Sequence, residues 1–275
     1  MSDTAGKMNA TQVKRALLER LRFERAMGLE CVHPLPLKRV AAAQVAVTPA
    51  RTMSAAPAVP ASSAASTGVP HTVGGIKEAF PLPTPATPEA KAVRWKQLET
   101  LANGCVKCVL HKGRTNVVFG TGNRNADLLF IGEGPGFDED QVGQPFVGKA
   151  GQLLNKIITA MGMKREDVYI CNVVKCRPPE NRTPLPDEMA ACSPYLFEQI
   201  ELVSPKAIVT LGNPATQTIL RTSTGIMSMR GRWGKYKDIP VMPTFHPAFV
   251  LRQYTEEVRR QVWSDMKAVV ERLKA

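Results

Sequence analysis

Short apolar runs alternate with amphipathic segments over the second two thirds of the chain. Four compact runs have the length and side chains typical of buried strands, at residues 126–132, 168–174, 207–212 and 240–245. Helical spacing is found at residues 88–102, 150–161, 187–202 and 256–273, and in a short segment from Pro214. Strands that alternate with helices predict a mainly parallel sheet covered by helices on both faces.

In such a sheet, functional residues gather where the parallel strands end. Each predicted strand is followed or closed by a polar or turn-forming residue at its carboxyl end, and these residues are Glu133, Asn172, Gly212 and His246. We therefore expect the functional site at this edge of the sheet.

The first 86 residues differ from the rest of the chain in composition and in the spacing of their apolar side chains. Residues 11–29, within an N-terminal tail of residues 1–40, place apolar side chains near helical spacing and predict an amphipathic helix. That helix is either solvated or a docking element for a protein partner or DNA. In residues 41–75, Ala, Pro, Ser and Thr supply 23 of 35 positions. Because this composition offers few large apolar side chains, we expect residues 41–86 to be a disordered linker.

Composition narrows the class of protein. No run approaches the roughly 18 apolar residues of a membrane-spanning helix, and the N-terminus lacks the order of a secretion signal. Six Cys in 275 residues are too few for a disulfide scaffold, which favours a reducing cytoplasm. The net charge of +12 makes a polyanionic partner plausible.

Four of the cysteines predict a metal centre. Cys105 and Cys108 form a C-x2-C pair, and Cys176 and Cys192 follow the second strand. On spacing alone, a [4Fe-4S] cluster and zinc are equally compatible with this set, and buried free thiols are a third possibility. The other two lie apart from the set: Cys171 is expected in the core, and the last, Cys31, is expected to be a free thiol outside the domain.

The glycine-rich turn after the first strand does not match a nucleotide-binding motif. Its first part, Gly132 to Gly136, reads GEGPG rather than GxGxxG. Residues 143–150 differ from a phosphate-binding loop at their last position, where Ala150 replaces the hydroxyl residue.

Four motifs, together with the four cysteines, resemble the family 4 uracil-DNA glycosylases. They are GEGPG, QPFVGKAGQLL, VYICNVVKCRPPENRTPLP and TFHPAFVLR, and the resemblance runs from about Lys91 to the C-terminus. It implies a three-layer αβα sandwich with a mostly parallel four-stranded sheet over residues 87–275. It also implies a [4Fe-4S] cluster on Cys105, Cys108, Cys176 and Cys192. The implied activity is monofunctional removal of uracil from single- or double-stranded DNA, which leaves an abasic site.

The resemblance implies roles for three side chains. An enzyme of this kind flips uracil out of the DNA, and Phe146 would stack on the extruded base. The amide of Asn172 would donate to uracil O4 and accept from N3–H. His246 would stabilise the charge that develops on O2. On sequence alone, each side chain has an alternative role. Phe146 could pack in the core, Asn172 could cap the end of its strand, and His246 could be a structural histidine.

Acidic and wedge residues complete the implied site. The segment Glu133, Gly134 and Pro135 would hold the base through backbone groups, and the Glu133 carboxylate would orient water or stabilise a cationic sugar. Glu139 is either a second acid of the site or an exposed charge. Leu251 would fill the space that the flipped base leaves while Arg252 reaches a phosphate; alternatively, Leu251 is the first core residue of the last helix.

Two other functions are compatible with the same fold. Some cluster-bearing relatives trap DNA covalently through a His in the loop after the second strand, but residues 176–184 contain no His. The main alternative is a non-catalytic iron-sulfur protein that binds DNA or a polymerase. We expect a cytoplasmic monomer without membrane association in either case.

Overall fold

The structure, a computed structural model, describes residues 87–274 together with Thr11 and Leu18. The predicted linker at 41–86, Cys31 and nearly all of the helix predicted at 11–29 lie outside the described residues. Within the described part, no helix is both long enough and apolar enough to cross a membrane.

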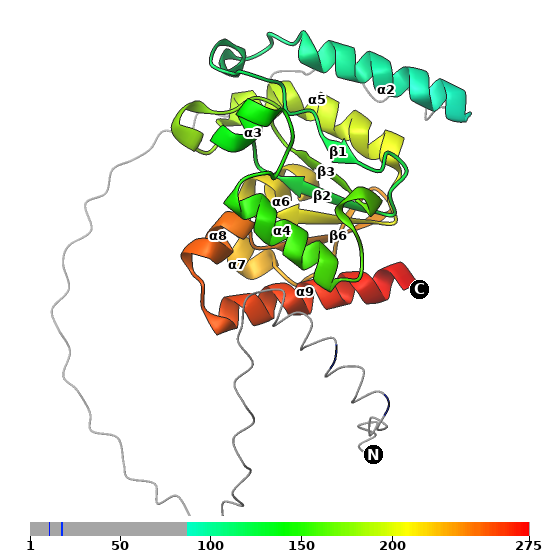
Figure 1. Ribbon diagram of the computed structural model, residues 1–275, viewed down its shortest axis with the longest axis vertical. Coiled ribbons are helices and arrows are strands. Elements are labelled where there is room, and N and C mark those ends of the chain that lie inside the picture. The colour runs from blue at the N-terminus through cyan, green and yellow to red at the C-terminus, as the bar shows by residue number, and fades with distance from the viewer. Residues whose placement is uncertain (1–10, 12–17, 19–86, 275) are drawn as a thin grey trace, which may run out of the picture. The chain divides into compact units, whose positions relative to one another are not determined.

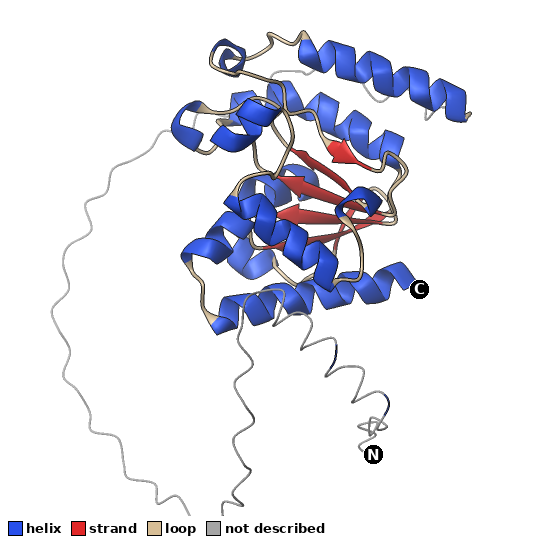
Figure 2. Cartoon of the chain, in the orientation of Figure 1, coloured by secondary structure: helices blue, strands red, loops and turns tan. Residues whose placement is uncertain are grey.

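A six-stranded mixed sheet forms the centre of residues 87–274 (Figures 1 and 2). Its order is β1-β3-β2-β4-β6-β5. The strands are β1 (Thr121–Gly122), β2 (Leu128–Gly132), β3 (Tyr169–Asn172), β4 (Ala207–Leu211), β5 (Gly234–Tyr236) and β6 (Ile239–Thr244).

The four predicted strands correspond to the parallel strands β3, β2, β4 and β6. The expected count of four was wrong, because β1 and β5 add an antiparallel strand at each edge. These edge strands have two and three residues, which is too short for any alternation of apolar and polar positions to appear in the sequence.

Helices cover both faces of the sheet and make the three expected layers (Figure 1). One face carries α2 (Pro88–Asn103), α5 (Pro186–Val203) and α6 (Asn213–Leu220), and the other carries α4 (Lys149–Ala160), α8 (Pro247–Arg252) and α9 (Glu256–Lys274). Shorter elements connect these layers: η1 (Val109–Lys112), α3 (Phe137–Val142), η2 (Arg165–Asp167), η3 (Pro179–Asn181) and α7 (Ile226–Met229).

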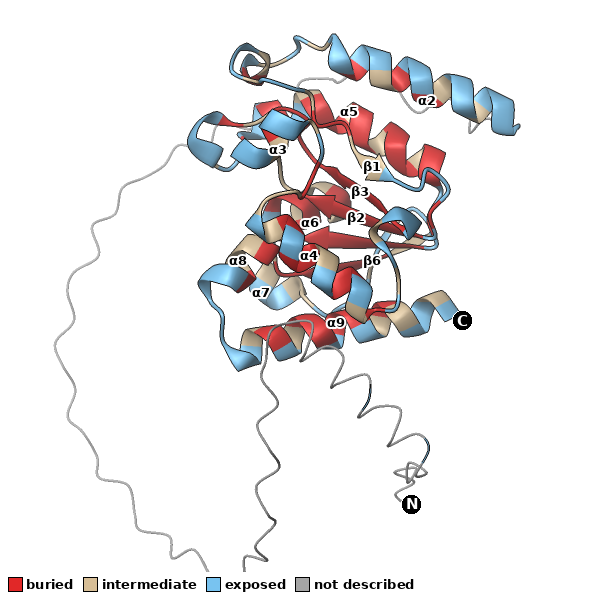
Figure 3. Ribbon diagram, in the orientation of Figure 1, coloured by how far each residue is buried: buried red, intermediate tan, exposed pale blue. Residues whose placement is uncertain are grey.

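Each face of the sheet has its own apolar core. Along β2, Leu129 and Ile131 pack with α2 and α5, whereas Leu128 and Phe130 pack with α4 and α9. Every residue of β2 is buried, as Figure 3 shows for the whole sheet centre. This two-sided burial is the reason that the strands are continuous apolar runs.

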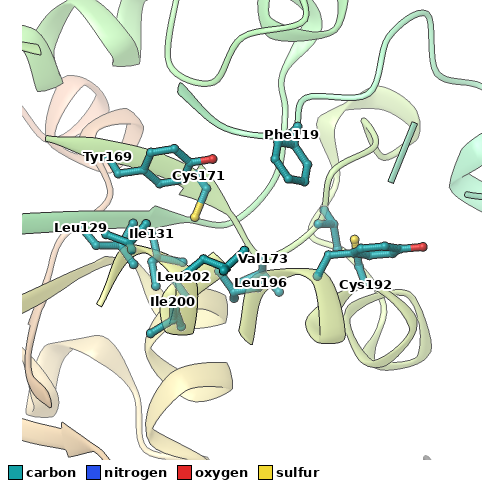
Figure 4. Close-up of a cluster of buried hydrophobic side chains, with 14 of the residues drawn as sticks. Phe119, Leu129, Ile131, Tyr169, Cys171, Val173, Cys192, Leu196, Ile200 and Leu202 are labelled. Carbon is teal, nitrogen blue, oxygen red and sulfur yellow. The ribbon is translucent and has the colours of Figure 1, made fainter. Parts of the chain in front are cut away.

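Cys171 belongs to the first of these cores, as its mid-strand position predicts. Figure 4 shows its side chain among Tyr169, Ile131 and Leu202, with Cys192 apart from it on α5. It is fully buried. The core assignment of Cys171 is therefore confirmed.

The Glu139 carboxylate joins the two loops that follow β2. One oxygen, Oε2, accepts the Gly136 N–H at 3.1 Å, at the start of α3. The other, Oε1, accepts the N–H groups of Val147 and Gly148 at 2.9 and 3.0 Å, at the start of α4. One side chain thus fixes the loop of residues 132–136 against the loop that carries Phe146.

Replacing this carboxylate by an amide tests its structural contribution. In Glu139→Gln the NH2 group must face at least one backbone N–H, so charge-assisted hydrogen bonds are lost and a donor meets a donor. We expect the free energy of unfolding to fall by about 1–3 kcal/mol, and Tm to fall by roughly 2–4 °C for each kcal/mol.

Thermal unfolding measures this change, and Glu166→Gln is the matched control. Glu166 is an exposed carboxylate, 4.0 Å from the Lys164 ammonium, so its replacement should leave Tm nearly unchanged. Equal Tm values for the two variants would show that the Glu139 carboxylate does not hold the loops.

Candidate functional site

A cavity of about 430 Å³ opens at the carboxyl ends of the parallel strands. Residues from five segments line it, among them the ends of β2 and β3 and the start of α8. All six residues expected to contact the base line this cavity, namely Glu133, Gly134, Pro135, Phe146, Asn172 and His246. The fold therefore brings together residues that are more than one hundred positions apart in the chain.

Asn172 is the last residue of β3 and only 1% exposed, yet its side-chain Oδ1 has no hydrogen-bond partner. A buried amide oxygen without a partner costs free energy, so such groups are rare unless a ligand or water completes them. The alternative of a strand-end cap gains no support, because a capping oxygen would accept a backbone N–H.

The Phe146 ring lies beside this amide, and a glycine makes room for both. A Cβ atom on Gly132 would collide with Oδ1 of Asn172 and with the Phe146 ring. Phe146 has a left-handed backbone with φ of 55°, and a Cβ on Gly151 would collide with its carbonyl. Loop conformation as well as core packing thus places this ring on the cavity wall, where it is 5% exposed.

His246 begins α8 and has a defined tautomer. Its Nδ1 accepts the N–H of Ala248 at 3.1 Å, so the ring proton of the neutral form is on Nε2. Burial, with a smaller effect of the Arg252 cation, lowers the pKa of His246 to about 4. The ring is therefore neutral near pH 7, and its centroid lies 5.7 Å from that of Phe146.

Glu133 is a partly buried acid of the cavity. Burial raises the pKa of this carboxyl above its ordinary value, against smaller opposing effects of a hydrogen bond with Thr183 and the charge of Arg252. Glu139 lines the same cavity, but its oxygens are occupied by three backbone N–H groups. Glu139 is therefore not an exposed charge. Backbone groups already occupy both of its oxygens, although it lines the cavity.

Leu251 and Arg252 lie on α8, which is a separate short helix. Leu251 is 39% exposed, so the interpretation of Leu251 as the first core residue of the last helix is wrong. Six residues are too few to show helical periodicity, and for this reason α8 could not be distinguished from α9 in the sequence. Arg252 lines the cavity itself.

Several basic residues of the domain, among them Arg182 of the cavity wall, have partners within the protein. Arg182 makes two hydrogen bonds with the buried carboxylate of Glu188, at 2.7 and 2.8 Å. Arg230 pairs with Asp265 in the same way, and Lys237 pairs with Glu201. Part of the positive charge of the domain is therefore held in ion pairs within the protein.

The proline-rich loop after Cys176 forms one wall of the cavity. Its lining residues, which were not selected as site residues from the sequence, are Pro178, Asn181, Arg182, Thr183 and Pro184. The signal was present in the motif PPENRTP, where closely spaced prolines predict a rigid turn beside the strand end.

A second, smaller cavity contains the four cysteines expected to bind metal. Cys105, Cys108, Cys176 and Cys192 all line it, together with Lys175. Within residues 87–274, no three His, Cys, Asp or Glu side chains are grouped to hold a single metal ion. Four thiols that line one cavity match the four-cysteine donor set of a [4Fe-4S] cluster.

The surroundings of these thiols also fit an anionic cluster. The Arg114 guanidinium donates to Cys176 Sγ, and the Lys175 backbone N–H donates to Cys192 Sγ, both at 3.3 Å. Burial raises the pKa of Cys108, Cys176 and Cys192, so bound iron would be needed to keep them as thiolates. The donor set and its hydrogen bonds therefore fit a [4Fe-4S] cluster.

Comparison with known proteins gives consistent matches. Residues 119–267 match the family model described as the uracil DNA glycosylase superfamily. A type-4 uracil-DNA glycosylase of Thermotoga maritima is 49% identical over 167 residues, which are 59% of this chain and 86% of that protein. A type-4 uracil-DNA glycosylase of Archaeoglobus fulgidus is 46% identical over 177 residues, or 61% and 87% of the two chains.

A more distant match is a DNA polymerase of Bacillus phage SP01, 33% identical over 135 residues. The matched region is 49% of this chain and 14% of that protein. The match to the family model and the identities with two type-4 enzymes agree with the arrangement of the cavity. The chain therefore belongs to the uracil DNA glycosylase superfamily and, within it, to the type-4 uracil-DNA glycosylases.

Proposed function

We propose that this protein is a DNA repair glycosylase that flips uracil out of DNA and hydrolyses its N-glycosidic bond, leaving an abasic site. Besides family membership, the observation that carries the proposal is the unpartnered Oδ1 of Asn172, buried at the end of β3 beside an aromatic ring. A pyrimidine with an N3–H would supply the missing hydrogen bond.

Base recognition follows from this geometry. With Oδ1 as the acceptor of uracil N3–H, the Asn172 NH2 group is directed to O4. Cytosine has an unprotonated N3 and an amino group at C4. Its N3 would face Oδ1 of Asn172, acceptor against acceptor, and its amino group would face the Asn172 NH2 group, donor against donor. Phe146 stacks on the flipped base and regains part of the unstacking cost of a few kcal/mol.

Bond cleavage uses the two other polar groups of the cavity. As the bond to the sugar breaks, negative charge develops on uracil O2, and the neutral His246 donates from Nε2. The Glu133 carboxylate holds the attacking water and opposes the positive charge of the sugar. Gly134 and Pro135, on the same turn, bring backbone groups to the base.

The four cysteines of the second cavity would hold a [4Fe-4S] cluster, which ties the loop before η1 to the segment after β3 and to α5. The cluster supplies cross-linking of these segments when bound, and no step of the reaction is assigned to it. Reduced thiols suit a cytoplasmic protein.

Leu251 and Arg252 project from α8 beside the cavity and are suited to contact DNA. An exposed leucine can fill the space that the flipped base leaves in a duplex, and the arginine can bind a phosphate. All of these residues come from one chain, which is consistent with a monomer. Any role of the N-terminal helix toward a protein partner lies outside the described residues.

Release of free uracil from single- and double-stranded oligonucleotides tests the proposal directly. We expect Asn172→Ala and His246→Ala each to lower kcat/KM by about 10²-fold or more, since each removes a contact with the base.

Leu251→Ala should reduce activity on duplex DNA and spare single-stranded DNA, which has no gap to fill.

Wild-type activity that survives in both Asn172→Ala and His246→Ala would refute the assigned roles. Binding of DNA without release of uracil would favour the non-catalytic alternative. A protein–DNA adduct that survives denaturation would favour covalent trapping.

The pH dependence of kcat/KM tests the role of Glu133. Because burial raises the pKa of Glu133, activity that needs its carboxylate should be lost as the pH falls through this raised value. His246 remains neutral down to about pH 4, so it should not set this acidic limb. We expect Glu133→Gln to be slower and to lack the limb. An unchanged limb in that variant would assign it to another group.

Iron content and visible absorption test the cysteine assignment. We expect Cys176→Ser to lose the cluster absorption and to unfold at a lower temperature. The matched control is Cys171→Ala, because Cys171 is also a buried cysteine but does not line the cavity. Loss of iron in the control alone, or retention in both, would contradict the ligand set.

A further inference from the structure

Lys175 is a buried lysine between the two cavities. It is 2% exposed, and its ammonium donates to the Asn172 carbonyl at 2.8 Å and to Gln199 Oε1 at 2.5 Å. Its backbone N–H donates to Cys192 Sγ at 3.3 Å, and Lys175 is among the residues that line the cysteine cavity. One residue thus contacts both Cys192, a predicted cluster ligand, and Asn172, the residue expected to read the base.

The partner of Lys175 on the other side is itself fixed. Gln199, which is fully buried, donates through Nε2 to the Phe119 carbonyl at 2.9 Å and to the Tyr169 hydroxyl at 3.3 Å. Its Oε1 is therefore held toward the ammonium. Gln199 and Lys175 together clamp the backbone at the end of β3.

The Lys175 ammonium is hydrogen-bonded to neutral oxygens rather than to a carboxylate. Among the ion pairs of residues 87–274, none involves Lys175, and its two acceptors are neutral oxygens. A buried ammonium is costly without an opposite charge nearby. Four thiolates around an iron cluster in the adjoining cavity would supply that charge.

We propose that Lys175 is a positioning residue that couples the cluster to uracil recognition by fixing the Asn172 backbone. This inference rests on the proposed function. The ammonium holds the carbonyl of Asn172, and a bound cluster would stabilise the ammonium through its negative charge. The orientation of the Asn172 amide would then depend on both. Lys175 touches neither uracil nor the reacting atoms.

The test uses Lys175→Met, which keeps an unbranched apolar stem and the backbone N–H to Cys192 but removes the ammonium. In the full-length, cluster-loaded protein we expect affinity for free uracil to fall by about 10–100-fold, as is typical when a supporting partner is removed. The reduction potential of the cluster should fall, because a nearby positive charge favours the reduced form.

The matched control is Lys206→Met. Lys206 is 64% exposed and pairs with Asp127 on the surface, so its replacement should change neither uracil affinity nor the potential. A double-mutant cycle with Asn172→Ala separates positioning from general damage. If Lys175 acts through Asn172, Lys175→Met should have little further effect on uracil affinity once the amide is gone.

Wild-type uracil affinity in Lys175→Met, or additive effects in the cycle, would overturn the inference. If Lys175→Met does not fold, Gln199→Met serves instead. It removes the second acceptor of the ammonium, together with the Gln199 hydrogen bonds to Phe119 and Tyr169, and leaves the ammonium on the Asn172 carbonyl. We expect a smaller loss of affinity in the same direction, and unchanged affinity would overturn the inference. Wild-type protein that binds no uracil would instead refute the proposed function.

Discussion

The carboxylate of Glu139 is the interaction on which the geometry of the base cavity depends. Three backbone N–H groups, from Gly136, Val147 and Gly148, converge on it. These donors belong to the starts of two successive helices, where N–H groups have no partners within the helix. A single anion satisfies both starts, and the left-handed backbone of Phe146 is held between them. The Glu139 carboxylate thereby fixes the shape of the cavity through its hydrogen bonds to the backbone.

A second constraint comes from the short segment of residues 172–176. It continues the pairing of β3 beyond the strand end, because the Val173 and Val174 N–H groups donate to the carbonyls of Gly132 and Glu133 at 3.0 and 3.2 Å. The same segment begins with Asn172 and ends with Cys176. The residue proposed to read the base and one proposed cluster ligand thus share one stretch of backbone, so a displacement of either end would be transmitted to the other.

The parts of this structure that could be predicted are those encoded by burial along a continuous stretch. The four parallel strands and their flanking helices are long apolar or periodic segments, and the convergence of Glu133, Asn172 and His246 follows from the parallel topology. The strands β1 and β5 and the helices α3 and α8 are too short to carry a period. The role of Glu139 could not be inferred because its partners are backbone groups, which every residue has. The pairing of Arg182 with Glu188 likewise depends on a turn whose path the sequence does not specify.

The placement of the cysteine cavity also has a consequence for the unfolded chain. Cys105 and Cys108 precede the first strand of the sheet, whereas Cys192 lies on α5, after half of the parallel strands have been formed. A cluster bound by all of them closes a long loop of polypeptide. Closing such a loop lowers the entropy of the unfolded chain, and the gain grows slowly with loop length. The proposed metal centre would then cross-link distant parts of the chain without a disulfide.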